Sequence, residues 1–298
     1  MKHIKVNEKS YVYIINYKDD DLLRKSFNHL MMKTYKFNLE EYYQSGYWGE
    51  GYIPYSILDG DKVVSNVSVN VMDFSYMGEK MRFIQIGTVM TDLEYRNQGL
   101  NRYLMGQVLR EWRDKCDLVY LFANDSVLEF YPKFGFVPTR EYQCSKEIHT
   151  ENRTLNIVKL DMSAEKDKNL LMDTVNESVH FAKLSVRDSS STMFYCTSFM
   201  KGNVFFIKDF NAIAIAEFKD NMVYLNDVYC KKEVLLDDII EAMVTKENNK
   251  VVLGFTPKDT ESYNQTVLHE ENTTLFILDD KKRIFNNNKI MFPVLSHA

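Results

Sequence analysis

A turn rich in basic and amide residues lies near the middle of the first half of the chain and could bind an anion. Arg96 and Arg102 flank Gly99, and apolar residues then recur at spacings of three and four, which predicts a helix that begins near Gly99. The first backbone amides of a helix have no partner within it, and the helix dipole favours negative charge there. Gly99 has no side chain that would keep a phosphate from the backbone. The turn therefore predicts a site for a phosphate-bearing ligand.

The residues of this turn resemble the signature of the Gcn5-related N-acetyltransferase (GNAT) family. That signature is Arg or Gln, two residues, Gly, one residue, and then Gly or Ala. The matching run here is Arg96-Asn97-Gln98-Gly99-Leu100-Asn101. The family's second half is matched by Asn124, which ends an apolar strand, and by Phe130-Tyr131-Pro132-Lys133-Phe134-Gly135-Phe136. The resemblance covers about the first 145 residues.

Asn101 departs from the pattern, because the family has Gly or Ala at this position. Either the backbone keeps its path with the Asn101 side chain turned away, or contact with a pyrophosphate is weakened. We expect the first, because Asn tolerates unusual backbone angles better than most residues.

The resemblance implies acetyl-coenzyme A as the co-substrate and direct transfer of its acetyl group to the amine of a small molecule or peptide. It implies Tyr131 as the general acid that protonates the departing thiolate. The residues that it implies for cofactor binding are Val89, Met90, Thr91, Arg96, Asn97, Gln98, Gly99, Leu100, Asn101, Arg102 and Asn124. The rival interpretation is a protein that binds or senses acyl-coenzyme A without turnover, which Asn101 favours. A purely structural protein would require the whole ordered motif to be accidental.

The last nine residues, 290–298, are unusually apolar for a chain end and should be packed. Some multidomain members of the family place their terminal carboxylate in the amino-terminal active site. The resemblance therefore makes the Ala298 carboxylate, or the neighbouring His297 imidazole, a candidate for the base. The alternative is a final strand over 290–292 that closes the sheet of the second half and leaves His297 and Ala298 in solvent.

The elements that must position these residues follow from periodicity. The spacing predicts an amphipathic helix over 19–37 and alternating strands over 55–58, 63–72 and 82–90. The apolar run 118–123 predicts a strand buried on both faces. The aromatic segment 42–55 is either a wall of the acceptor site or a loop folded onto the core. The resemblance implies an α+β fold whose central, mostly antiparallel sheet has a splayed pair of strands and is flanked by helices.

The second half repeats this order of elements. A helix is expected over 170–175, an aromatic helix or loop over 193–199, and strands over 204–207, 212–218 and 222–225. A helix over 235–243 and strands over 251–255 and 275–278 follow. The connection before the later helix, 230–234, has no glycine and nothing like the turn at Gly99. We therefore expect a GNAT domain over 1–150 and a degenerate GNAT-like domain over 151–298, without a second cofactor.

The amino-acid composition limits which other classes of protein this chain could belong to. Hydrophobic residues make up 45% of the chain and charged residues 27%, which indicates a packed protein. A net charge of -5 gives no reason to expect nucleic acid binding. The four cysteines form no CxxC pair that would predict a metal site or a disulfide framework. The sequence lacks a signal-like amino terminus and any run of about 18 apolar residues, so we expect a cytoplasmic protein with no membrane partner.

Overall fold

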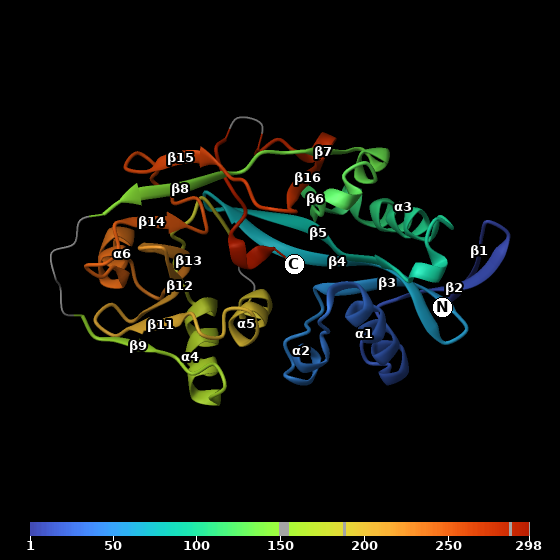
Figure 1. Ribbon diagram of the computed structural model, residues 1–298, viewed down its shortest axis with the longest axis horizontal. Coiled ribbons are helices and arrows are strands. Elements are labelled where there is room, and N and C mark those ends of the chain that lie inside the picture. The colour runs from blue at the N-terminus through green and yellow to red at the C-terminus, as the bar shows by residue number, and fades with distance from the viewer. Residues whose placement is uncertain (149–154, 187–188, 286–287, 298) are drawn as a thin grey trace.

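The computed structural model describes residues 1–148, 155–186, 189–285 and 288–297. The first half is a sheet covered by helices (Figure 1). Its elements are β1 (Lys2–Val6), β2 (Lys9–Ile15), α1 (Asp21–Tyr35), α2 (Glu40–Gln44), β3 (Tyr52–Asp59), β4 (Lys62–Tyr76), β5 (Glu79–Thr91), α3 (Leu100–Trp112), β6 (Leu118–Ala123) and β7 (Phe136–Pro138). The mixed α+β class and the predicted elements of this half are confirmed, with β3, β4 and β5 longer than expected.

The strands of this sheet are mostly antiparallel, with one parallel pair at its centre. Among the described residues the sheet path runs β1-β2-β3-β4-β5-β6, continues through a strand of the second half, and ends at β7. β5 and β6 pair in parallel only from Phe83 to Gln85 on the β5 side. Beyond Gln85 no pairing holds the two strands together. The predicted splayed pair is therefore present.

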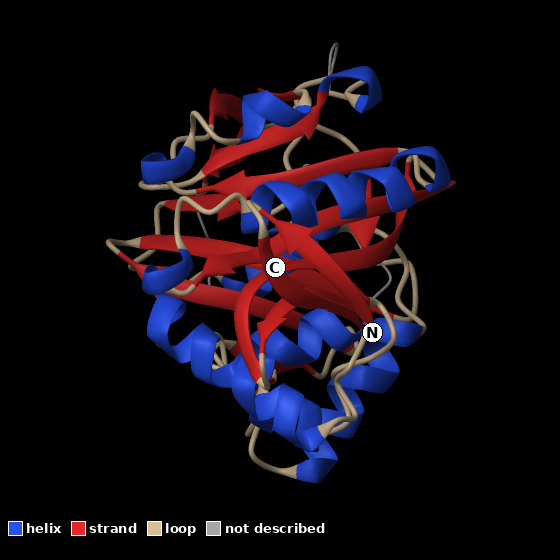
Figure 2. Ribbon diagram, turned by 90° about the vertical axis from the view of Figure 1, so that its right-hand side faces the viewer, coloured by secondary structure: helices blue, strands red, loops and turns tan. Residues whose placement is uncertain are grey.

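Helices α1 and α3 cover opposite faces of this sheet, as Figures 1 and 2 show. Successive strand residues point to opposite faces. Ile57 and Val64 accordingly pack in one apolar cluster with Leu104 of α3, while Leu58 and Val63 pack in another with α1. Asp20 caps α1 by accepting hydrogen bonds from the amides of residues 22 and 23.

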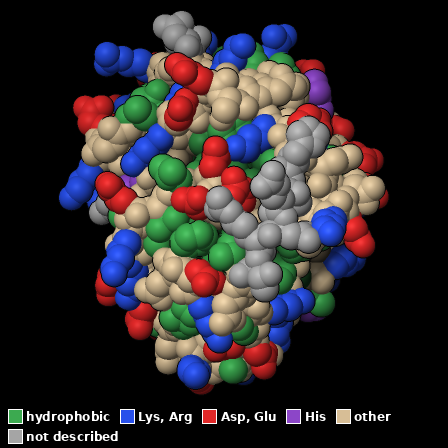
Figure 3. All heavy atoms as spheres, turned by 90° about the vertical axis from the view of Figure 1, so that its left-hand side faces the viewer, with side chains coloured by type: hydrophobic (Ala, Val, Ile, Leu, Met, Phe, Trp, Pro, Cys, Tyr) green, Lys and Arg blue, Asp and Glu red, His purple; other side chains and the backbone are tan. Residues whose placement is uncertain are grey.

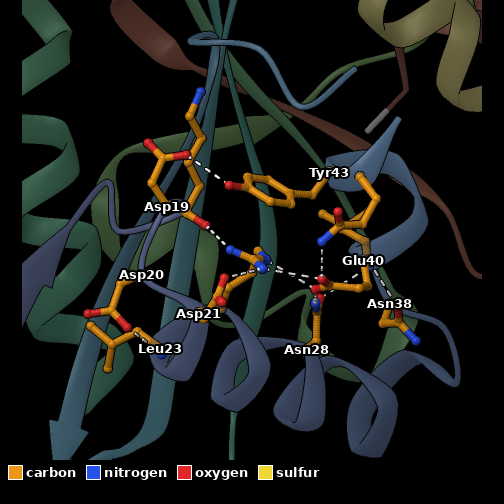
Figure 4. A network of polar contacts seen from close by, with 12 residues as sticks. Asp19, Asp20, Asp21, Leu23, Asn28, Asn38, Glu40 and Tyr43 are labelled. Atoms are coloured by element: carbon orange, nitrogen blue, oxygen red, sulfur yellow. Dashed lines mark hydrogen bonds and ion pairs between the residues drawn. The ribbon is translucent and has the colours of Figure 1, made fainter. Parts of the chain in front are cut away.

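A buried arginine fixes α2 against α1. The Arg24 side chain, 2% exposed, donates from Nε to Glu40 Oε2 at 3.1 Å and from Nη1 to the Lys18 carbonyl at 2.7 Å. Asn28 also donates to Glu40 Oε2 at 2.9 Å, and Figure 4 shows its side chain pointing toward that carboxylate. Because the charge of Arg24 is paired and hydrogen-bonded, its burial is tolerated. The network holds the helix whose far end, at Tyr35, reaches the functional cleft.

The aromatic segment after α1 is part of the core. Trp48 is 4% exposed and packs against Phe27 of α1 and Tyr52 of β3. None of the aromatic residues 42–55 lines the cleft described below. The interpretation as a loop folded onto the core agrees with this packing, and the acceptor wall over 42–55 stays a prediction.

The second half forms another antiparallel sheet with one parallel pair. Its elements are β8 (Tyr142–Glu147), β9 (Ile157–Lys159), α4 (Glu165–Asn176), β10 (Leu184–Val186), α5 (Ser189–Thr197), β11 (Val204–Ile207), β12 (Ala212–Lys219), β13 (Met222–Cys230), α6 (Leu236–Met243), β14 (Lys250–Leu253), β15 (Asn264–Val267) and β16 (Thr274–Leu278). The order β12-β13-α6-β14, with β13 and β14 parallel, repeats β4-β5-α3-β6. This repetition is consistent with the expected two-domain arrangement.

The two sheets exchange strands. β16 lies between β6 and β7 in the first sheet, and β8 lies between β14 and β15 in the second. The expected division at residue 150 falls within 149–154, outside the described residues, and stays a prediction. The chain therefore leaves the first sheet after β7 and returns to it twice, through β10, which pairs with the end of β4, and through β16.

The carboxyl-terminal segment is packed, but the predicted strand over 290–292 is wrong. Its amides bond to side chains instead of to a strand: Met291 donates to Thr256 Oγ1 at 2.9 Å, and Phe292 donates to Glu141 Oε1 at 2.8 Å. The Phe292 ring stacks on Tyr120 of β6 with centroids 4.0 Å apart. A short 3-10 turn, η6 (Val294–Ser296), follows. The segment thus packs against the first half while it is bonded to residues of both halves.

The face on the left of Figure 1 carries interspersed acidic, basic and apolar side chains (Figure 3). No helix in the described part of the chain is long and apolar enough to cross a membrane. Within that same part, no group of three or more His, Cys, Asp or Glu side chains is placed to bind a metal.

Candidate active site

A cleft of about 1350 Å³ opens where β5 and β6 separate. Its walls come from the end of β5, the amino-terminal turn of α3, the residues after β6, the last turn of α1 and the β1-β2 hairpin. All the predicted cofactor residues line it except Gln98, together with Tyr131. The structure therefore brings together segments that are far apart in the sequence.

A bulge in β5 shapes the inner wall of this cleft. The register with β4 shifts between Asn66 and Ser68, and Thr88 has a φ of 48°. A positive φ is uncommon for a β-branched residue. The buried Asn66 amide holds the strained residue by donating to the Thr88 carbonyl at 2.8 Å, and the Tyr52 and Thr88 hydroxyls lie 2.7 Å apart. The ladder is thus interrupted beside Val89.

Val89, Met90 and Thr91 follow this bulge and line the cleft. The Val89 carbonyl accepts a hydrogen bond from the Tyr35 hydroxyl at 2.9 Å. Burial raises the pKa of Tyr35 to about 12, so this hydroxyl keeps its proton at neutral pH. Tyr35 therefore ties the end of α1 to the strand that is predicted to bind the cofactor.

The predicted phosphate turn has the conformation that anion binding requires. Gly99 is the N-cap of α3 with a φ of 80°, and Asn97 has a φ of 61°. No side chain caps the helix, which leaves its first amides facing the cleft side of the turn. Unusual backbone angles occur at these two residues, whereas Asn101 is an ordinary helical residue.

Asn101 is held by a neighbouring strand. Its side-chain oxygen accepts a hydrogen bond from the Ser65 hydroxyl of β4 at 2.7 Å. The backbone thus continues as the second residue of α3. The expectation that the backbone keeps its path agrees with this geometry, although its reason is the bond to Ser65 and not a tolerance of unusual angles.

Gln98 points away from the cleft. Its Oε1 accepts from the Tyr11 hydroxyl at 2.8 Å, and its Nε2 donates to the Glu94 carbonyl at 3.0 Å. Its own backbone carbonyl accepts from Asn7 Nδ2 at 2.9 Å. Gln98 therefore supports the turn from behind instead of lining the ligand site.

Unpaired cations dominate the outer part of the cleft. Lys5, Arg102 and Lys133 line it and make no ion pair within the described residues, while Arg96 donates only to the Thr91 carbonyl at 3.4 Å. Glu129 is the single carboxylate side chain among the lining residues. An arrangement of four cations against one carboxylate, beside a helix amino terminus, favours a ligand that carries several phosphates.

A buried carboxylate, Asp92, anchors the segment between β5 and the turn at Gly99. Asp92, 5% exposed, lies 2.8 Å from Lys62 Nζ and 3.1 Å from Lys33 Nζ. The hydrogen bond from Lys62, helped by that from Lys33, lowers the pKa of Asp92 to about 2. Asp92 is thus ionised at neutral pH and joins α1, β4 and the start of the turn.

Tyr131 lies on the opposite wall, in the 3-10 turn η4 (Tyr131–Phe134). It is 5% exposed and packs against Phe136 and against Phe276 of β16. Burial raises the pKa of Tyr131 well above its ordinary value, so the hydroxyl is protonated at neutral pH. This hydroxyl makes no hydrogen bond to any residue that the structure describes, which leaves it able to donate to a ligand.

His297 is not among the residues that line the cleft, although its ring packs against one of them. Its ring stacks on Phe122 of β6, a lining residue, with centroids 3.9 Å apart, and the Tyr195 hydroxyl donates to the His297 carbonyl. The Nε2 atom is buried and has no hydrogen-bond partner among the described residues. Burial lowers the pKa of this imidazole to about 4. The expectation that His297 lies in solvent is wrong, while Ala298 falls outside the described residues.

Several contributors to the cleft were not anticipated from the sequence. Lys5 and Asn7 come from the β1-β2 hairpin, and Tyr35 from the last turn of α1. The Asn7-Glu8 pair between two alternating segments is a signal for a hairpin turn. No local signal placed that hairpin beside Gly99, some 90 residues later in the chain.

The corresponding place in the second half is nearly closed. Val228, Tyr229 and Phe255 enclose, with Pro293 of the terminal segment, a cavity of about 30 Å³. That volume is roughly one water molecule's share of the liquid. Val294 also donates its amide to the Gly254 carbonyl at the end of β14, at 2.9 Å. The terminal segment thus fills the space where the first half has its cleft.

Comparison with protein families matches residues 20–139 to the acetyltransferase (GNAT) domain. Comparison with curated protein sequences gave no match. The chain is similar in structure to a probable N-acyltransferase from Enterococcus faecalis V583, at 14% identity and a TM-score of 0.60, over 90% of this chain and 72% of that one. It is also similar to Eis1 from Mycobacterium abscessus, at 11% identity and a TM-score of 0.54, over 91% and 74%.

A GCN5-related N-acetyltransferase from Kribbella flavida is a third similar structure, at 12% identity and a TM-score of 0.54, over 90% of this chain and 71% of that one. At these identities the likeness concerns the fold. It extends over both sheets and so reaches well beyond residues 20–139.

Proposed function

We propose that the chain, whose residues 20–139 match the acetyltransferase (GNAT) domain, moves an acetyl group from acetyl-coenzyme A to the amine of a small molecule or peptide. One observation carries the proposal: a single cleft joins a cation-lined helix amino terminus to a buried, protonated Tyr131 at the splayed strands. A cofactor with phosphates at one end and a thioester at the other matches that distribution.

The cofactor would lie with its pyrophosphate at the first amides of α3 and its pantetheine arm along Val89 to Thr91. We propose Arg96, Asn97, Gly99, Leu100, Asn101 and Arg102 as the phosphate end of the site, and Asn124 as a polar contact after β6. The positive charge of Arg96 and Arg102 supports this assignment, because charge-assisted hydrogen bonds to phosphate are strong. Gln98 would act indirectly, by holding the turn.

The chemical step would be a direct transfer. The amine nitrogen forms a bond to the thioester carbonyl carbon, and the carbonyl oxygen gains negative charge that a backbone amide near Val89 to Thr91 would stabilise. The carbon-sulfur bond then breaks, and the thiolate takes the proton of the Tyr131 hydroxyl. The proton lost by the amine passes to a base, and no covalent enzyme intermediate is needed.

We propose that the base comes from the chain end, with the His297 imidazole and the Ala298 carboxylate as the two candidates. The stacking of His297 on Phe122 supports a position at the wall of the cleft. With a pKa of about 4 the imidazole is neutral at pH 7 and can accept a proton, although it is a weak base.

The four cysteines are buried and form no disulfide, which suits a reducing compartment. We therefore propose that the protein is located in the cytoplasm.

Calorimetry with acetyl-coenzyme A, followed by an assay of thiol release across a library of amines, tests the proposal. We expect binding, and release of free coenzyme A with at least one class of amine. Binding without release on any amine would favour a sensor of acyl-coenzyme A. Absence of binding would contradict both functions.

A further inference from the structure

The β1-β2 hairpin is built against the phosphate turn, although it precedes the part of the chain that matches the GNAT family. Asn7 donates from Nδ2 to the Gln98 carbonyl at 2.9 Å, and the Tyr11 hydroxyl donates to the Gln98 side chain at 2.8 Å. A side chain at Gly99 would begin 3.8 Å from both Asn7 Nδ2 and Val6 Cγ1. The hairpin and the turn therefore form one surface.

Lys5 gives this surface a free positive charge. Its backbone pairs with Ser10 in the hairpin, and its exposed side chain lines the cleft. Neighbouring lysines are already engaged: Lys9 pairs with Asp59 at 2.9 Å, and Lys62 with Asp92 at 2.8 Å. Lys5, in contrast, has no ion pair or hydrogen bond among the described residues. Its ammonium is available to a ligand in the cleft.

The order of the protein groups along the cleft indicates which part of the cofactor the Lys5 ammonium would bind. The end of β5 and Tyr131, after β6, line the cleft where the two strands separate, and the amino-terminal turn of α3 follows β5. The hairpin contacts this turn through Asn7 and Tyr11, and Figure 1 shows β1 and β2 on the side of α3 away from β6. In coenzyme A the thioester, the pantetheine arm, the pyrophosphate and the ribose 3′-phosphate follow one another in the same order. The phosphate beyond the pyrophosphate would therefore reach the hairpin.

We propose that Lys5 binds the ribose 3′-phosphate of the cofactor, so that the hairpin makes the site selective for coenzyme A over its 3′-dephospho form. This inference rests on the proposed function, because it requires the cofactor to lie along the cleft as described. Lys5 would contact the 3′-phosphate, whereas the turn at Gly99 would contact the pyrophosphate. Its effect should therefore be separable from that of Arg96 and Arg102.

Calorimetry on the full chain with coenzyme A and with 3′-dephospho-coenzyme A provides the test. We expect Lys5→Ala to weaken the binding of coenzyme A roughly 5- to 30-fold, in line with the loss of one charge-assisted hydrogen bond. The 3′-dephospho form should bind the parent protein and the variant equally well. Lys2→Ala is the matched control, because Lys2 lies on the same strand but does not line the cleft. It should change neither affinity.

Equal weakening for both ligands would place Lys5 at the pyrophosphate and overturn the assignment. Unchanged affinity for coenzyme A would show that Lys5 does not contact the cofactor. If the parent protein binds neither ligand, the proposed function itself fails and this inference falls with it. If the parent protein binds both ligands with the same affinity, the 3′-phosphate has no partner in the site.

Discussion

Residues from both halves of the chain bury Tyr131 and so keep its hydroxyl protonated. Phe136 follows it by five residues, whereas Phe276 comes from β16 and reaches Tyr131 only because that strand lies beside β7. Together they bury the ring while its hydroxyl stays free to donate. The general acid proposed for the thiolate is therefore completed by the second half of the molecule.

Replacing Tyr131 with Phe should lower kcat roughly 10- to 1000-fold, because the variant cannot donate a proton to the thiolate. Affinity for acetyl-coenzyme A should change little, since the aromatic packing is kept. Steady-state rates and calorimetry measure the two effects. Tyr103→Phe is the matched control, because Tyr103 also lines the cleft but packs its ring on Tyr13. Equal turnover by Tyr131→Phe and the parent protein would remove Tyr131 from the mechanism.

Deleting only His297 and Ala298 tests the proposed base. The apolar packing of the terminal segment depends on Phe292 and Leu295, so the shortened protein should fold and bind acetyl-coenzyme A. Turnover should fall at least 10-fold if the chain end accepts the amine's proton. His297→Ala, which keeps a terminal carboxylate, then separates the imidazole from the carboxylate. A shortened protein with the full rate would show that the terminus has no catalytic role.

Local chemistry explains which site residues the sequence could predict. The turn at Gly99 is specified by neighbouring residues, so nearly all of the residues predicted there line the cleft. Gln98 was the exception, because its side chain is recruited by Tyr11, more than 80 residues away. Lys5 and the stacking partner of His297 were out of reach for the same reason. Their roles depend on tertiary contacts that no local pattern encodes.

At the scale of elements, β5 and the terminal segment show two ways in which a sequence with the pattern of a strand can depart from regular strand pairing. β5 pairs with β4 in one register as far as Gly87, and a bulge held by Asn66 then interrupts the ladder at Thr88. The terminal segment has the apolar run of a strand, yet its amides bond to Thr256 and Glu141. Periodicity predicted the burial of that segment correctly but could not choose its hydrogen-bond partners. The choice was made by buried polar side chains from distant loops.

Glu141 makes the packing of the terminal segment sensitive to pH. Burial raises its pKa to about 8, with a smaller contribution from Glu270. The folded protein therefore holds a proton between pH 4.5 and 8 that the unfolded chain releases, and this group's contribution to stability is lost as pH rises through that range.

Glu141→Gln keeps an acceptor for the Phe292 amide and removes the titration. Relative to the parent protein, we expect the free energy of unfolding of the variant to rise by roughly 2 to 4 kcal/mol between pH 5 and pH 8. Urea denaturation at several pH values measures this difference. Glu147→Gln, at an exposed position of β8, is the control and should show no such change. Parallel pH profiles for Glu141→Gln and the parent protein would contradict the assignment.

At the scale of the whole molecule, the exchange of β8 and β16 makes the two halves interdependent. The repeated order of elements in each half could be predicted, because periodicity and turns are local. The partner of β16 could not be predicted, since an apolar run of strand length fits either sheet. The structure places it between β6 and β7, directly behind Tyr131. The sheet of the region that matches the GNAT domain, residues 20–139, is therefore completed by a strand that begins at Thr274.

A fragment of residues 1–150 tests this interdependence. Without β16, the edge of β6 and the strand β7 lose their pairing, and apolar residues such as Leu121 and Phe136 lose the cover of Phe276. We expect the fragment alone to unfold without a cooperative transition and to bind no acetyl-coenzyme A. Co-expression with residues 151–298 should restore both properties, with the two fragments eluting together at equal stoichiometry. Circular dichroism, calorimetry and size-exclusion chromatography make the comparison. A fragment 1–150 that folds cooperatively by itself and binds acetyl-coenzyme A as the full chain does would show that β16 is dispensable.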